Sequence, residues 1–159
     1  MTDTLSVDQR SRRMASVGQK NTKPELVVRR ALHSFGFRFR LYEPTLPGHP
    51  DIVLPKHGAV IMVHGCFWHG HGCRRRALPS SNMDFWRSKI ERNMHRDAVA
   101  VSELEDLGWR VLTLWECAIL SNSETRARSL ASVFDWIRSD LPSRQVGRSD
   151  SLDGVKSRS

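Results

Sequence analysis

The segment His64–Cys73, with the sequence HGCFWHGHGC, constrains the fold of this chain more than any other part. It holds two of the three cysteines, and the third is Cys117. An odd number of cysteines does not build a disulfide framework, so metal binding explains them better. Cys66, His71 and Cys73 bring three soft ligands into one loop, and Cys117 follows an apolar strand pattern that could present it as the fourth. We therefore predict a closed tetrahedral site for a structural zinc ion.

Two alternatives to this zinc site stay open from the residues alone. The cysteines could be unrelated core thiols beside a surface histidine. His69 is also spaced to replace His71 as the imidazole ligand.

The pattern of apolar residues predicts an α/β domain with a central mixed β-sheet flanked by helices. A capping box at Thr22–Glu25 predicts a helix over residues 23–35. Further elements are expected as a strand at 37–41, a hairpin of 52–54 and 59–63, a functional loop at 64–80, two helices within 81–107, a strand at 110–115 and a helix at 124–138. The domains are then a flexible basic arm (1–21), the folded domain (22–139) and a disordered tail (140–159).

A second cluster of polar residues surrounds the predicted hairpin. If the hairpin turns tightly at His57–Gly58, Asp51 sits opposite His64, with His69 five residues on and Glu25 at the start of a helix. Such a cluster suits magnesium and water, with Asp51 as the oxygen ligand and the imidazoles for proton transfer. Each residue has a structural alternative, because Glu25 can be a capping acid, His64 the end of a strand, and Asp51 a turn residue.

The charge of the chain indicates a polyanionic partner. It has 25 basic against 17 acidic residues, a formal net charge of +8. Most of the basic residues are Arg, whose planar fork binds phosphate through two hydrogen bonds. No apolar run approaches the roughly 18 residues of a membrane helix, and the N-terminal stretch lacks the apolar core of a secretory signal. We expect a cytoplasmic protein that binds nucleic acid and no membrane.

Phe67 and Trp68 lie between a predicted zinc ligand and a predicted catalytic histidine. The loop is held too tightly to place both rings in the core, so at least one should be exposed. Large rings on a basic surface can enter a base stack at a cost of about a few kcal/mol per step, which is least at a mismatch. Phe85–Trp86 could add to this platform, although Phe85 is expected to pack in the core.

These segments resemble the very short patch repair family of DNA mismatch endonucleases, from about Arg10 to Cys117. The segment His64–Cys73 resembles the central motif of the family and is long enough to be specific. The supporting matches are Arg10-Ser11 with Met14, Thr22–Glu25, Pro47–Asp51, Phe85-Trp86, Asn93 with Arg96-Asp97, and Trp115–Ala118.

The resemblance implies a restriction-endonuclease-like fold and magnesium-dependent hydrolysis of the phosphodiester 5′ to the thymine of a T:G mismatch. Asp51 and the backbone carbonyl of Val63 then correspond to the magnesium ligands, and His69 to the residue that activates water. Glu25 and His64 correspond to the supporting catalytic pair. The other correspondences are zinc ligands at Cys66, His71, Cys73 and Cys117, intercalating rings at Phe67, Trp68 and Trp86, a minor-groove contact at Met14, and positions near bases at Lys89 and Asn93.

Two positions depart from the family pattern. Val63 stands where the family often has Thr, which changes little if the backbone carbonyl is the metal ligand but removes a hydroxyl if one is needed. His49 replaces a more usual Arg, which would alter a phosphate contact.

The sequence as a whole predicts a monomeric repair nuclease that acts on double-stranded DNA of the nucleoid. Its substrate would be the T:G mismatch left when 5-methylcytosine deaminates, which links it to a cytosine-5 methyltransferase and to mismatch-repair proteins. Two rivals stay open: a restriction-type nuclease that cuts both strands, and a non-catalytic, zinc-stabilised binder of distorted DNA.

Overall fold

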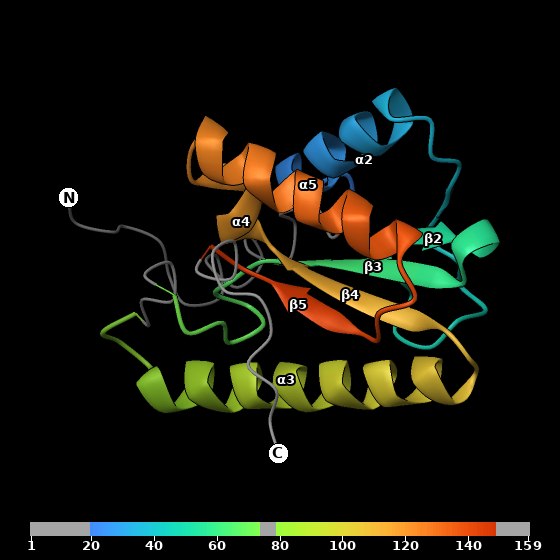
Figure 1. Ribbon diagram of the computed structural model, residues 1–159. Coiled ribbons are helices and arrows are strands. Elements are labelled where there is room, and N and C mark those ends of the chain that lie inside the picture. Colours follow the sequence, from blue (N-terminus) through green and yellow to red (C-terminus); the bar gives the residue numbers. More distant parts are fainter. Residues whose placement is uncertain (1–19, 74–78, 149–159) are drawn as a thin grey trace, which may run out of the picture.

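A single five-stranded sheet forms the centre of the protein in a computed structural model, which describes residues 20–73 and 79–148 (Figure 1). The strands lie in chain order, β1-β2-β3-β4-β5. β1–β2 and β2–β3 are antiparallel, whereas β3–β4 and β4–β5 are parallel, so the predicted mixed sheet is confirmed. The strands are β1 (Arg40–Leu41), β2 (Ile52–Leu54), β3 (Ala59–His64), β4 (Arg110–Trp115) and β5 (Arg144–Val146).

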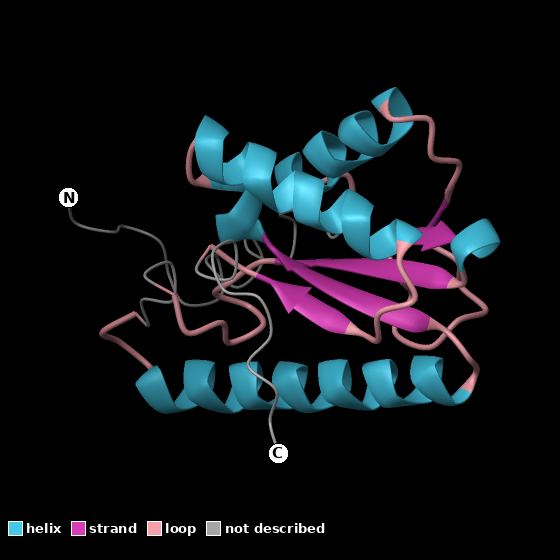
Figure 2. Cartoon of the chain, viewed as in Figure 1, coloured by secondary structure: helices cyan, strands magenta, loops and turns pink. Residues whose placement is uncertain are grey.

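Helices cover both faces of the sheet (Figures 1 and 2). α3 (Met83–Asp106) lies along one face, and α2 (Lys23–Ser34), α4 (Glu116–Leu120) and α5 (Ser123–Arg138) lie against the other. α3 is one continuous helix, so the prediction of two helices in this segment is wrong. The predictions for α2, β4 and α5 agree with the structure within a residue or two, and α4 was not predicted.

The core is split between the two faces of the sheet because successive side chains of a strand point in opposite directions. Ile52, Ile61 and Leu112 pack toward α2, α4 and α5. Val53, Val60 and Val111 pack toward α3. Since both faces are covered, β2 and β3 are buried at every position, which explains their continuous apolar sequences.

The hairpin of β2 and β3 has a longer turn than predicted. Ile52 pairs with Ile61 and Leu54 with Ala59, so the predicted tight turn at His57–Gly58 is wrong. A 3-10 turn, η1 (Pro55–His57), is closed by Gly58 in the left-handed conformation with φ of 58°. The turn therefore uses four residues instead of two, and His64 does not face Asp51. Because the register differs by two residues, every side chain keeps its predicted face.

The ordered part of the chain extends beyond residue 139. Residues 144–146 form β5, which pairs with β4 through Leu112, Thr113 and Leu114, so the prediction of disorder is wrong for this part of the tail, whereas residues 149–159 lie outside the described residues. Val146 joins the larger core cluster. The Ser, Arg and Gln residues around it had indicated disorder, but a short edge strand needs few apolar residues when a sheet already exists. Within the described ranges, no helix combines the length and apolar character that crossing a bilayer requires.

Candidate active site and metal centre

The candidate residues gather at the carboxyl ends of β3 and β4. These strands are parallel and in register, with His64 beside Trp115. Parallel strands end at the same edge of a sheet, so the loop after β3 and the helix after β4 start close together. A hydrogen bond from the backbone N–H of Cys66 to the Glu116 carboxylate, at 3.2 Å, ties the two segments. Topology thereby brings Cys117 to the loop that holds the other cysteines.

Four soft ligands form one cluster at this edge. The ligand atoms of Cys66, His71, Cys73 and Cys117 all lie within 4.8 Å of one another. Zn–S bonds of about 2.3 Å place tetrahedral ligands about 3.8 Å apart, so this donor set fits zinc. Cys66 and Cys117 are buried, and His71 and Cys73 are partly buried. His71, not His69, is the imidazole of the cluster, which resolves one alternative left open by the sequence.

The cysteine cluster already favours a thiolate. The pKa of Cys117 is lowered to about 5, first by a hydrogen bond from the Cys66 thiol and then by the backbone N–H of Arg148. The same hydrogen bond raises the pKa of Cys66, and burial adds to that rise. The Sγ atom of Cys117 lies 3.6 Å from Nδ1 of His71. A zinc ion requires deprotonated thiols, so the lowered pKa of Cys117 suits it.

A second cluster joins two histidines and an aspartate. The rings of His64 and His69 stack at 3.8 Å between centroids with an interplanar angle of 6°. Nδ1 of His69 lies 2.5 Å from Oδ2 of Asp97, and Nδ1 of His64 lies 4.0 Å from the same oxygen. An ionised Asp97 accepts the Nδ1 hydrogen of His69, which leaves Nε2 with a lone pair. This is the arrangement of a general base oriented by a carboxylate.

His64 differs from His69 in its burial. Burial lowers the pKa of His64 to about 3, with a further lowering by His69 and an opposing effect of Asp97. His64 is therefore neutral near pH 7, and its ring supports that of His69 without adding a second positive charge. The ring of Trp115 contacts His64 edge-on at 5.5 Å and stacks on His71 at 4.3 Å, so it separates the two clusters.

Asp51 directly precedes β2 and lies within electrostatic reach of His69. Its Oδ2 accepts a hydrogen bond from the backbone N–H of Val63 at 2.7 Å. Its pKa is raised to about 7, chiefly by burial; the charge of Glu25 contributes to this rise, whereas Val63, His69 and Arg29 oppose it. Two carboxylates within electrostatic reach in a buried place repel each other, and a divalent cation would relieve that repulsion. The oxygen donors present fit magnesium, whose ligands are oxygens.

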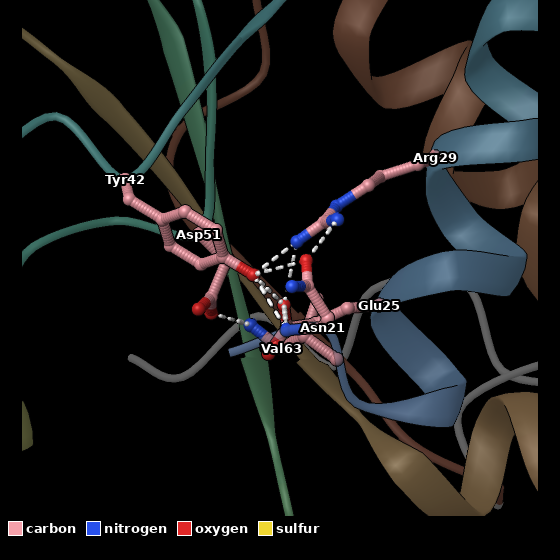
Figure 3. A network of polar contacts seen from close by, with 6 residues as sticks. All are labelled: Asn21, Glu25, Arg29, Tyr42, Asp51 and Val63. Carbon is pink, nitrogen blue, oxygen red and sulfur yellow. Dashed lines mark hydrogen bonds and ion pairs between the residues drawn. The ribbon is translucent and has the colours of Figure 1, made fainter. Parts of the chain in front are cut away.

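Glu25 is held by a network of donors instead of a capping box (Figure 3). Thr22 precedes α2 but makes no side-chain capping hydrogen bond, so the predicted capping box is not formed. The Oε2 atom of Glu25 accepts hydrogen bonds from Asn21 N at 3.2 Å, Arg29 at 2.8 Å and Tyr42 at 2.6 Å. Glu25 is only 2% exposed, so these donors compensate its loss of water.

The predicted aromatic platform is present but more covered than expected. Phe67 and Trp68 are both half-buried, so neither is exposed in the sense predicted. Their rings lie 5.2 Å apart, and Trp86 of α3 lies 5.8 Å from Phe67 and 5.9 Å from Trp68. Trp86 is 6% exposed whereas Phe85 is 49% exposed, so the expectation that Phe85 packs in the core is wrong. Since residues 85 and 86 are neighbours on a helix, only one of them can face the sheet.

Lys89 and Asn93 contact the aromatic loop within the protein itself. Nζ of Lys89 lies 5.4 Å from the centroid of the Trp68 ring, and the Asn93 amide donates to the Trp68 carbonyl at 2.9 Å. Gly70 allows the loop to approach α3, because a Cβ there would lie 2.4 Å from Sδ of Met94. Its φ of 69° is also one that favours glycine. The loop is thus held against α3 at Trp68 and at Gly70.

Asp97 is the main residue of this cluster to which the sequence alone gives no role. It belongs to a segment, Arg96-Asp97, that resembles the family pattern. A signal existed in the spacing of α3, where Trp86, Ile90, Ala100 and Leu104 are buried at intervals of a core-facing stripe. Asn93 and Asp97 occupy the polar gaps of that same stripe, so a helical projection would have turned both toward the loop.

The remaining predicted positions have simpler outcomes. Met14 lies outside the described residues. Val63 meets Asp51 through its backbone N–H, while its side chain packs in the larger core cluster, so a valine satisfies this position. His49 is exposed and has a φ of 46°, and Gly48 before it packs where a Cβ would lie 2.6 Å from Ala100.

Comparison with known proteins gives one consistent result. A family model described as DNA mismatch endonuclease Vsr matches residues 2–75. The Type II nicking enzyme V.XorIIP of Xanthomonas oryzae pv. oryzae is 50% identical over 132 residues, which cover 82% of this chain and 97% of that relative. V.NmeAIP, a Type II nicking enzyme of Neisseria meningitidis, is 43% identical over 80% of this chain and 91% of its own length. The DNA mismatch endonuclease Vsr of Escherichia coli is 35% identical over 92% of this chain and 94% of its own length.

Proposed function

Since this chain belongs to the Vsr family of DNA mismatch endonucleases, we propose that it nicks DNA 5′ to the thymine of a T:G mismatch. The family makes it a DNA endonuclease, and the relatives named as nicking enzymes fit cleavage of one strand. We further propose the T:G mismatch as the substrate, magnesium as the catalytic metal, and a role for each residue of the site.

The observation that carries the proposal is the pairing of His69 with Asp97 beside buried Asp51. The Nδ1 atom of His69 lies 2.5 Å from Asp97, which fixes the ring and directs Nε2 away from the carboxylate. Nε2 then takes a proton from the water that attacks phosphorus, and Asp97 stabilises the imidazolium that results. His64, stacked on His69 and neutral because of its lowered pKa, keeps the ring in place.

Asp51 is the residue proposed to hold magnesium, with the backbone carbonyl of Val63 and with Glu25 in support. When bound, magnesium supplies positive charge against the negative charge that develops on the phosphate in the transition state. The raised pKa of Asp51 supports this assignment, because burial next to Glu25 leaves its negative charge uncompensated until a cation arrives.

Mismatch selectivity is assigned to the aromatic loop. Phe67 and Trp68 are half-buried and form edge-to-face contacts with Trp86, so the platform is preformed. Insertion of a ring between base pairs costs least where a mismatch has already weakened the stack. Lys89 and Asn93, which contact Trp68 in the free protein, would meet bases only after the loop engages DNA.

The wider assignments follow from the same site. We place the sheet and helices in the restriction-endonuclease-like architecture and assign zinc to the four-ligand cluster, where it is structural because all ligand positions are filled by the protein. The biological substrate would be double-stranded DNA in which 5-methylcytosine has deaminated, which implies an association with a cytosine-5 methyltransferase. We propose that the protein acts as a monomer.

The test is a cleavage assay with end-labelled duplexes that differ only in one T:G or one T:A pair inside a methylation target. The unsubstituted protein should nick the thymine strand of the T:G duplex when magnesium is present. Asp51→Asn should abolish the nick, and Asp135→Asn, an exposed aspartate on α5, should leave it unchanged. A T:A duplex cut equally fast in both strands would favour the restriction-type nuclease, and tight binding without any nick would favour the non-catalytic binder.

A further inference from the structure

We propose that Tyr42, held by Arg29, is a positioning residue that fixes the carboxylate of Glu25 toward the magnesium site. The inference rests on the proposed function, because it assigns Glu25 to that site. It concerns the side-chain network of Asn21, Glu25, Arg29 and Tyr42 (Figure 3).

Tyr42 connects the two acids of the site. Its backbone N–H donates to the carbonyl of Asp51 at 3.4 Å, and its hydroxyl donates to Oε2 of Glu25 at 2.6 Å. Tyr42 follows β1, whereas Glu25 belongs to α2 and Asp51 precedes β2. A single residue therefore connects the backbone of Asp51 to the side chain of Glu25.

The hydroxyl of Tyr42 has two acceptors within reach, Oε2 of Glu25 at 2.6 Å and Oδ1 of Asn21 at 3.4 Å, and the shorter contact is the one to Glu25. Its oxygen accepts hydrogen bonds from Asn21 N at 2.7 Å and from Arg29 Nη2. These two donors occupy its lone pairs, so its own hydrogen points at Glu25. Burial raises the pKa of Tyr42, and Glu25 raises it further, which keeps the hydroxyl protonated as a donor.

The network leaves one oxygen of Glu25 for another partner. All three donors, Asn21, Arg29 and Tyr42, converge on Oε2. Within the described residues, no hydrogen bond to Oε1 is found. The carboxylate is thus anchored through one oxygen while the second stays available to a cation or a water molecule.

The backbone at Tyr42 supports the same interpretation. Its φ is 50°, in the left-handed region that bulky residues rarely adopt. Such a conformation is unfavourable for a bulky side chain and persists only where the surroundings constrain it. The bonds to Asp51 and Glu25 provide that constraint, and strain of this kind gathers at functional sites.

The experiment measures magnesium binding without DNA, through the rise of the melting temperature as magnesium is added. Tyr42→Phe removes the hydroxyl and keeps the ring, and should raise the magnesium concentration at the midpoint about three- to tenfold, the loss expected for one charge-assisted hydrogen bond. Nicking at saturating magnesium should stay within about twofold, because the reacting groups His69 and Asp97 are untouched.

A double-mutant cycle separates positioning from general destabilisation. In a Glu25→Gln background, Tyr42→Phe should leave the magnesium midpoint unchanged, because the charged carboxylate that Tyr42 orients is gone. An equal shift of the midpoint in both backgrounds, or no shift in either, would overturn the inference. A protein without any magnesium-dependent melting shift would overturn it as well. If the unsubstituted protein does not nick the T:G duplex but Tyr42→Phe shows the expected shift of the magnesium midpoint, the result would count against the proposed function alone.

Discussion

The loop after β3 contributes residues to two clusters of side chains. The two clusters differ in the type of their ligands and in whether the protein fills every ligand position. The first cluster, Cys66 with His71, Cys73 and Cys117, has soft ligands within 4.8 Å of one another. Four protein ligands fill a tetrahedral zinc site and leave no position for water. The second cluster, taken here as His64, His69 and Asp97 together with Asp51, has carboxylates, a neutral imidazole at His64, and a second imidazole, His69, bonded to a carboxylate. A site that must hold shape is closed, and a site that must exchange water and substrate is left incomplete.

The division follows the order of residues in the loop. His64 and His69 belong to the second cluster, whereas Cys66, His71 and Cys73 belong to the first. The ring of Trp115 contacts both His64 and His71 and so lies between the two clusters. Phe67 and Trp68 lie between Cys66 of the first cluster and His69 of the second cluster. The first cluster thereby flanks the part of the loop that holds Phe67, Trp68 and His69.

The largest effect should come from breaking the first cluster. Cys117→Ser removes a ligand of lowered pKa, and we expect loss of zinc and of several kcal/mol of folding free energy, up to about 10 kcal/mol by comparison with zinc-finger peptides. Zinc content by atomic absorption and thermal melting would measure it. Cys73→His, which preserves four ligands, is the control and should retain zinc. A Cys117→Ser protein with unchanged zinc and melting temperature would remove the structural role.

Breaking the second cluster should have the opposite effect on stability. Asp51→Asn should reduce nicking by about 10⁴-fold, because several kcal/mol of transition-state stabilisation depend on the metal it holds. The folded pKa of Asp51, about 7, lies above its ordinary value of 3.8, so the native state is penalised above pH 7 and gains stability as the pH falls toward 4.

The substitution should therefore stabilise the protein when no magnesium is added. We expect a gain of about 2 kcal/mol at pH 8, seen as a melting temperature higher by a few degrees, and almost none at pH 4. Thermal melts at the two pH values would measure it, with Asp135→Asn as the exposed control. A stability loss at pH 8 would mean that Asp51 is a structural acid.

A smaller effect is expected from a change at Asp97, and it would separate the orientation of His69 from the binding of magnesium. Asp97→Asn keeps the size of the side chain but cannot hold the Nδ1 hydrogen of His69 as a carboxylate does, so nicking should fall about 10²-fold. DNA binding and magnesium response should stay unchanged, since Asp97 contacts neither in this assignment. A parallel loss of magnesium binding would instead make Asp97 a metal ligand together with the histidines.

The smallest effect concerns the residues between the two clusters. Phe67→Ala should lower the preference for T:G over T:A duplexes about tenfold, the equivalent of about 1 to 2 kcal/mol of base stacking. Rates of nicking on both duplexes would measure it. Phe35→Ala, which removes an exposed ring on α2's C-terminal side, should leave the preference unchanged. Equal losses on both duplexes would show that the ring supports the loop and not the choice of mismatch.

The sequence was sufficient where local pattern decides the outcome. The apolar runs of β2, β3 and β4 and the periodicity of α5 predicted these elements, and the spacing of Cys66, His71 and Cys73 predicted their cluster. Cys117 could be joined to them because parallel strands end at one edge.

The sequence was insufficient where non-local contacts decide. The turn between β2 and β3 uses four residues because Pro55 starts a 3-10 turn. The local residue pattern does not determine the length of this turn. β5 exists because β4 offers an unpaired edge, not because of its own residues. The role of Asp97 depends on α3 crossing beneath the loop, and that of Tyr42 on three segments meeting at Glu25.

The most direct test of this division is a metal titration of one protein sample followed by three measurements. Magnesium is removed with a mild chelator, and zinc content, melting temperature and nicking of the T:G duplex are then recorded before and after magnesium is restored. We expect one zinc per chain to persist through the treatment, an intact fold, and nicking that disappears and returns with magnesium alone. Nicking that survives the removal of magnesium, or a fold and activity lost together and restored only by zinc, would contradict the separation of the two clusters.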